Sequence, residues 1–115
     1  MATSLWKAAE TVVGDLVAAG IRATMDPRSV NLPAVLVVPP QFDRETSCIG
    51  RALFTAFLIT RGPGNADAWQ SLDALLEQVS TVLAVDQIRP ASYVLDDGAP
   101  LPALEIQWTV GLSWP

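Results

Sequence analysis

Few residues of this 115-residue chain could carry chemistry, and histidine is missing altogether. Without histidine there is no Ser-His-Asp or Cys-His constellation, no imidazole base and no imidazole ligand for zinc. A serine–lysine pair would depend on Lys7, the only lysine, which the hydrophobic pattern puts on the polar side of a helix. Cys48, the single cysteine, has no clear basic neighbour to activate it, so we interpret it as a buried structural thiol.

Two further patterns have chemical precedents, but both are better explained as turns. Asp96 and Asp97 are adjacent carboxylates, yet the following Gly98 is typical of a hairpin tip, and calcium-loop spacing is missing. Gly62-Pro63-Gly64 precedes a predicted helix but lacks the Lys-Ser/Thr ending and the GxGxxG spacing of phosphate-binding loops. A glycosidase-type pair of distant carboxylates is left open, although nothing marks one out. We therefore expect a protein that is not an enzyme, with no cofactor and no metal.

The charge is acidic and unevenly distributed. The net charge is −5, and residues 61–115 carry seven acidic residues against Arg61 and Arg89, whereas residues 1–60 are balanced. Tight binding of DNA or RNA needs clustered cations that displace counterions from phosphates. No stretch of the sequence offers them, which excludes a tight grip on nucleic acid.

The composition favours assembly. Half of the residues are hydrophobic and the mean hydropathy is +0.34, more apolar material than a domain of this size buries comfortably alone. We expect one domain, residues 1–115, that covers surplus apolar surface with a partner. The alternative is a monomer that leaves this apolar surface exposed. No apolar run approaches the ~18 residues that span a bilayer. With one cysteine and no secretory-signal pattern, we expect folding in the cytosol and no membrane partner.

Two amphipathic helices must position these residues. From Ser4 to Ala19 apolar residues recur every three or four positions, and Gly20 supplies the stop. A second helix follows Arg61–Gly64. The predicted stripes are Leu5, Ala9, Val12, Val13, Leu16 and Val17, and then Trp69, Leu72, Leu75, Leu76, Val79, Val82 and Leu83.

The strands are predicted from β-branched and alternating runs. The longest is apolar on both faces, which is typical of a central strand covered twice, and another copy of the chain could supply the second cover. The last strand alternates, with Trp108 on its apolar face. Because Pro39-Pro40 cannot continue a ladder, Pro39–Thr46 is expected to be a projecting connection. The five predicted strands are Ile21–Met25, Ala34–Val38, Cys48–Thr60, Ser92–Leu95 and one that starts near Pro102.

These elements predict an α+β fold in the order α-β-β-β-α-β-β, with two helices packed on a mixed sheet of about five strands. Trp69 and Trp108 are core candidates, whereas Trp114 is a candidate subunit contact. The Pro39–Glu45 segment is either a solvated loop with Phe42 tucked under it or a docking arm. The candidate subunit or tube interface is Pro39, Pro40, Gln41, Phe42, Asp43, Arg44 and Trp114.

The element order, the size and three segments, NLPAVLVVPPQF, GPGNADAWQSLDALLEQV and DDGAPLPALEIQW, resemble the tail terminator proteins of long-tailed bacteriophages, particularly those that infect actinobacteria. The resemblance implies a ring, usually a hexamer, that caps the tail tube, ends its elongation and presents a face to the head connector or neck protein. It implies a place at the head-proximal end of the virion tail, after assembly in the host cytoplasm. DNA would cross the ring only as passing cargo.

A ring of this kind joins two different patches of neighbouring copies, which suits surplus apolar surface. Acidic residues could line its channel because like charge repels phosphate, and the candidates are Asp96, Asp97 and Glu105. Two alternatives remain: a phage neck or head-completion protein, and a small-molecule-binding α+β module.

Overall fold

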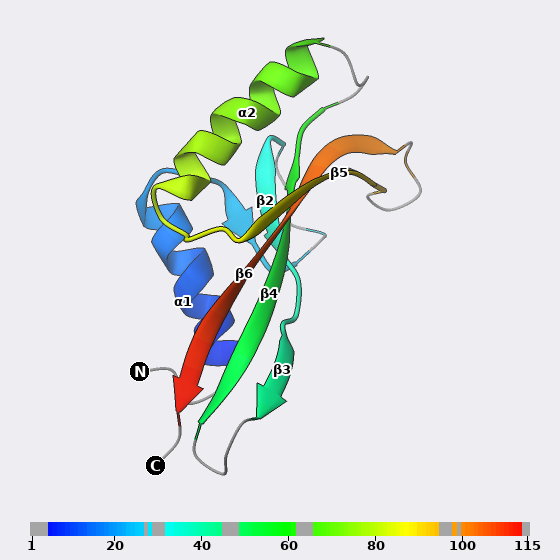
Figure 1. The fold of residues 1–115 in the computed structure, drawn as a ribbon. Coiled ribbons are helices and arrows are strands. Elements are labelled where there is room, and N and C mark those ends of the chain that lie inside the picture. Colours follow the sequence, from blue (N-terminus) through cyan, green and yellow to red (C-terminus); the bar gives the residue numbers. More distant parts are fainter. Residues whose placement is uncertain are drawn as a thin grey trace.

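The computed structural model describes residues 5–26, 28, 32–44, 49–61, 66–94, 98 and 100–113. Two helices and six strands follow one another along the chain (Figure 1). They confirm the predicted α+β class with a mixed sheet. The elements are α1 (Leu5–Ala18), β1 (Ala23–Thr24), β2 (Ala34–Val37), β3 (Gln41–Arg44), β4 (Ile49–Ile59), α2 (Ala66–Ser80), β5 (Gln87–Tyr93) and β6 (Leu101–Ser113).

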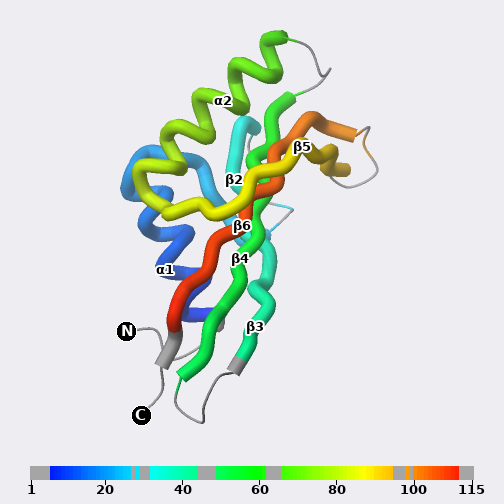
Figure 2. The backbone as a smooth tube through the Cα atoms, viewed as in Figure 1, coloured from blue at the N-terminus to red at the C-terminus, as the bar shows by residue number. Residues whose placement is uncertain are grey.

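The sheet is built around β4 and β6, which pair antiparallel along their whole length, from Ile49↔Ser113 to Ile59↔Ala103. The strand order is β1-β2-β4-β6-β5, and only the β1–β2 pair is parallel. On the side away from β6, β4 pairs first with β3 and then with β2. Figure 2 shows how β4 and β6 run side by side, with β3 lying beside the first half of β4.

The projecting connection predicted after Pro39-Pro40 is partly wrong. Gln41–Arg44 forms β3, which pairs antiparallel with β4 from Gln41↔Leu53 to Arg44↔Gly50. The prolines separate β2 from β3, but both strands pair with β4 on the same side, so the pairing along β4 resumes after the prolines. The Phe42 side chain is half-buried against the main core, which agrees with the alternative of a tucked aromatic.

The first helix ends as predicted. Gly20 has a φ of +83°, the left-handed conformation that glycine adopts without strain. The Ile21 N–H donates to the Leu16 carbonyl at 3.0 Å and the Gly20 N–H to the Val17 carbonyl at 3.0 Å. This pair of bonds is a Schellman motif, and the buried Ile21 and Leu16 side chains supply its hydrophobic contact.

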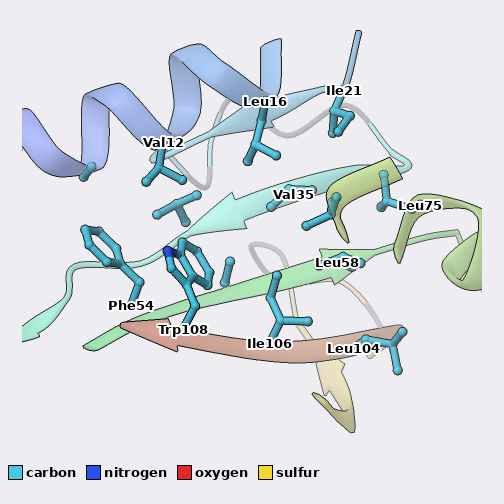
Figure 3. Packing of buried hydrophobic residues seen from close by; sticks show 14 of the residues in the cluster. Val12, Leu16, Ile21, Val35, Phe54, Leu58, Leu75, Leu104, Ile106 and Trp108 are labelled. Carbon is cyan, nitrogen blue, oxygen red and sulfur yellow. The ribbon is translucent and has the colours of Figure 1, made fainter. Parts of the chain in front are cut away.

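Both helices cover one face of the sheet and share one apolar core with it (Figure 3). On α2 the buried positions are Ala68, Leu72, Leu75 and Val79. Trp69 was expected in this stripe, but 58% of it is exposed. Successive side chains on a helix are rotated by about 100° about its axis, so Trp69, next to the buried Ala68, points away from the core.

Trp108 on β6 is a core residue, as predicted, and is only 3% exposed. Its ring stacks on Phe54 of β4 with a centroid distance of 5.4 Å and an interplanar angle of 10°. Leu104 and Ile106 are buried on the same face of β6. The alternation predicted for the last strand is therefore confirmed on its helix-covered side.

The opposite face of the sheet has no helix over it among the described residues (Figure 1). A small second cluster holds Leu36, Ile59 and Ala103 buried there, and the Phe57 and Tyr93 rings meet at its margin at 5.0 Å. Leu53 and Phe57 of β4 stay partly exposed. The apolar second face of β4 is therefore only partly covered within one chain.

Candidate interaction surfaces

The described residues offer no clustered chemistry. They contain no group of three or more cysteine, aspartate or glutamate side chains that could hold a metal ion. Neither described helix is long and apolar enough to cross a membrane. Cys48 and the turns around Gly62-Pro63-Gly64 and Asp96-Asp97 lie outside the described residues. The features that could bind a partner are surface patches and one open strand edge.

The predicted interface segment contributes its prolines to an apolar groove. Pro39 and Pro40 line a groove of about 220 Å³ beside Trp6, which belongs to α1 and is 63% exposed. Of the other predicted interface residues, Gln41 and Asp43 are exposed on β3, Phe42 is turned toward the core, and Trp114 lies outside the described residues. The groove is completed by Ala9, Met25, Val37 and Val38.

Glu105, one of the three predicted channel acids, forms an ion pair. Its Oε2 accepts a hydrogen bond from Nη2 of Arg89 on β5 at 2.6 Å, and the Glu105 side chain is 22% exposed. The two residues face each other across the β5–β6 pair on the uncovered face of the sheet. The Arg89 charge offsets that of Glu105, so this position presents little net charge to solvent.

A denser acidic surface lies on α2, which sequence reasoning left as an ordinary polar face. Asp67, Asp73 and Glu77 are all exposed, and the helix contains no basic residue. Trp69 stands exposed on the same helix. The signal was present in the composition of residues 66–80, where three acids and no cation share one helix.

A groove of about 660 Å³ lies between α1, the segment after α2 and the end of β6. Sequence reasoning missed it because its walls come from three distant parts of the chain. Trp108 is one of its lining residues, and the Trp108 indole N–H is the one buried side-chain donor in the described part of the chain without a partner. The other walls are Lys7, Ala8, Thr11, Val12, Asp15, Val82, Leu83, Ala84, Thr109, Val110 and Gly111.

Large apolar side chains remain exposed on several elements. Each is about half exposed or more, and they are distributed over α1, β4, α2, β5 and the residue after β5. Scattered apolar residues are normal on a protein surface, but large ones that accompany a half-covered sheet face indicate sites for partners. These residues are Trp6, Val17, Ile49, Trp69, Ile88 and Val94.

Compared with known proteins, the chain matches no protein-family model, no curated protein and no solved structure.

Proposed function

We propose that this chain is a tail terminator: a structural subunit that forms a ring, expected to be a hexamer, and caps the tail tube of a long-tailed bacteriophage. The ring ends tube elongation and offers its other face to the head connector or neck protein. The proposal starts from the resemblance of three sequence segments and the element order to tail terminators.

The observation that carries the proposal is the amount of apolar surface left uncovered in one chain. Both helices lie on one face of the sheet, and Leu53 and Phe57 remain partly exposed on the other. Trp6 and Trp69 are more than half exposed on two different helices. Apolar patches in separate places suit a heterologous ring, in which each copy offers one patch to each neighbour.

A role in passing DNA would need a channel that does not hold phosphate. Since Arg89 offsets Glu105, the acidic wall falls to Asp96 and Asp97, which lie outside the described residues, or to the outer face of α2. Reversing Asp96 and Asp97 to lysine is expected to impair DNA delivery more than tail length, because only delivery requires sliding phosphates. Unchanged infectivity would remove these two residues from the channel.

Tube capping tests the function directly. Tube protein is polymerised with and without the purified chain, and lengths and ends are counted by electron microscopy. We expect shorter tubes with a ring at one end when the chain is present. Tubes of unchanged length and bare ends would contradict the proposal.

The same preparation separates the neck-protein alternative. A terminator co-purifies with headless tails, whereas a neck or head-completion protein co-purifies with tailless heads. Binding to heads alone would favour the alternative. A monomer or dimer whose melting temperature rises with a small ligand would favour the binding-module alternative instead.

A further inference from the structure

The last residues of β6 have a neighbouring strand on one side only. β5 pairs with β6 from Tyr93↔Leu101 to Gln87↔Gln107, and the Asp86 N–H donates to the Gln107 carbonyl at 2.8 Å. Beyond that bond, β6 continues to Ser113 with β4 as its only partner among the described strands. Among the described residues, 109–113 therefore form an open edge.

Backbone alternation tells which groups lie on this edge. Gln107 directs its carbonyl toward β5, so Thr109 and Gly111 direct their N–H and C=O groups to the same side, where β5 has ended. Both residues are exposed. A row of unpaired backbone groups on a strand edge is a template for another strand.

The outer edge of β5, unlike the edge of β6, is protected against pairing with a further strand. The backbone groups of Leu104 point toward β4, where Leu104 stands opposite Leu58. Pro90 stands opposite Leu104 on the other side, so the Pro90 nitrogen points away from β6, to the outer side of β5. Proline has no N–H there, which blunts this edge against further pairing. The β6 edge contains no proline.

A second observation points to the same place. The 660 Å³ groove is lined by Thr109, Gly111 and Trp108, whose buried indole N–H has no partner among the described residues. Figure 3 shows the Trp108 indole rising from β6 toward α1, with its nitrogen on the side of Val12 and Phe54. A strand added to the edge would lie along this groove and cover its β6 wall.

We propose that residues 109–113 of β6 pair with β3 of the next copy of this chain, in parallel. β3 and β6 flank β4 on opposite sides of the same half of the sheet, and both are antiparallel to β4, so they run in the same direction. Rotation about an axis parallel to the strands does not change their direction. The β3 of a copy generated by such a rotation therefore runs parallel to this β6. Repeating the contact closes the sheets into a ring and removes the open β6 edge.

The charges agree with this pairing. Residues 109–113, Thr-Val-Gly-Leu-Ser, contain no charged side chain, so none of them opposes Asp43 or Arg44 of β3 with a like charge. This inference rests on the proposed function, since it names the contact by which the ring assembles. Its test must therefore separate failure of the contact from failure of the ring.

The first test removes one donor from the edge. Thr109→Pro deletes an N–H that points away from β4, so the β4–β6 bonds remain, whereas Thr109→Val keeps the N–H and the branched shape. We expect the proline variant to raise the concentration at half assembly by about tenfold or more, and the valine variant to leave it unchanged. Equal assembly of both variants would overturn the proposed contact.

The exchange measurement in the second test uses the wild-type chain, so it does not depend on a variant folding. Amide hydrogen exchange is followed across a concentration series, and the Thr109 and Gly111 amides are expected to gain protection as the ring forms. Gly111 and Asp43 both stand opposite Arg51 of β4, so they lie at the same height along the strands. A mixture of Gly111→Cys and Asp43→Cys chains, both with Cys48→Ser, is expected to cross-link between copies.

The outcomes are distinguishable. A ring that forms without protection at Thr109 and Gly111 leaves the proposed function standing and overturns the β6 contact. Protection without the cross-link overturns β3 as the partner strand. A chain that stays monomeric at every concentration, alone and with tubes, overturns both the contact and the ring.

Discussion

At the scale of single residues, the two tryptophans predicted for the core behave differently. Trp108 is 3% exposed and stacks on Phe54, whereas Trp69 is 58% exposed. We expect Trp108→Ala to lower the free energy of unfolding by about 3–5 kcal/mol, because it deletes a large ring from a packed core. Trp69→Ala should change it by no more than about 0.5 kcal/mol. Denaturant titration of both variants checks the contrast, and equal losses would contradict it.

The sequence could predict that both tryptophans border apolar stripes but not which side of the border each takes. Alternate residues of a strand share one face of the sheet, so Trp108 must lie on the same buried face as Leu104 and Ile106. On α2 the stripe follows the small Ala68, and one residue further along turns Trp69 outward. Hydrophobicity alone does not resolve such a shift on a helix.

Asp26 supplies a pH prediction. Its carboxylate accepts hydrogen bonds from the Arg28 backbone N–H at 3.0 Å and from the Arg28 side chain at 3.3 Å, and these lower the pKa of Asp26. A lowered folded-state pKa contributes stability above the unfolded pKa, and this is lost as the pH falls through the folded pKa.

An NMR titration of the Asp26 carboxyl is expected to show a midpoint below the ordinary value. Arg28→Ala should raise that midpoint only in part, because the backbone N–H, the larger cause, remains. Full return to the ordinary value would show that the side chain alone sets the shift.

At the scale of elements, β3 was missed because its own residues do not indicate a strand. Pro-Pro-Gln-Phe-Asp-Arg has the composition of a loop, and only the pairing of Gln41–Arg44 with Leu53–Gly50 makes it a strand. β5 begins earlier than predicted for a similar reason, since Gln87–Pro90 has only one β-branched residue and contains a proline that only an edge strand accepts.

The close approach of β3 to β4 can be tested at Gly50. A Cβ at this position would fall on the Phe42 ring and 2.9 Å from the Asp43 carbonyl oxygen, whereas a Cβ at Gly111 would meet nothing within 4 Å. Gly50→Ala should therefore lower the free energy of unfolding by about 1–3 kcal/mol, with faster amide exchange in β3. Gly111→Ala, the matched control on β6, should not; equal effects would contradict this contact.

A buried hydroxyl pair fastens the end of β4 to α2. Thr60, 4% exposed, and Ser71 lie with their hydroxyl oxygens 2.9 Å apart. A double-mutant cycle with Thr60→Val and Ser71→Ala is expected to give a coupling of about 1 kcal/mol. Strictly additive losses would mean that the bond contributes nothing to holding α2.

At the scale of the whole molecule, the sequence could predict the fold class, the two helices and the central strand, because hydrophobic periodicity carries those features directly. It could not predict the surfaces. The groove at the end of β6 is assembled from α1, Val82–Ala84 and Thr109–Gly111, and the Glu105–Arg89 pair depends on the β5–β6 register. Contacts between distant segments leave no local pattern.

In the proposed assembly, copies of this chain cover one another's exposed apolar surface. Native mass spectrometry over a concentration series, with and without tube protein, tests that claim most directly. For a 12.3-kDa chain, a six-copy ring predicts a species of about 74 kDa that persists on dilution or appears on tubes. A 12.3-kDa species alone at every concentration, with no tube-bound protein, would contradict the account.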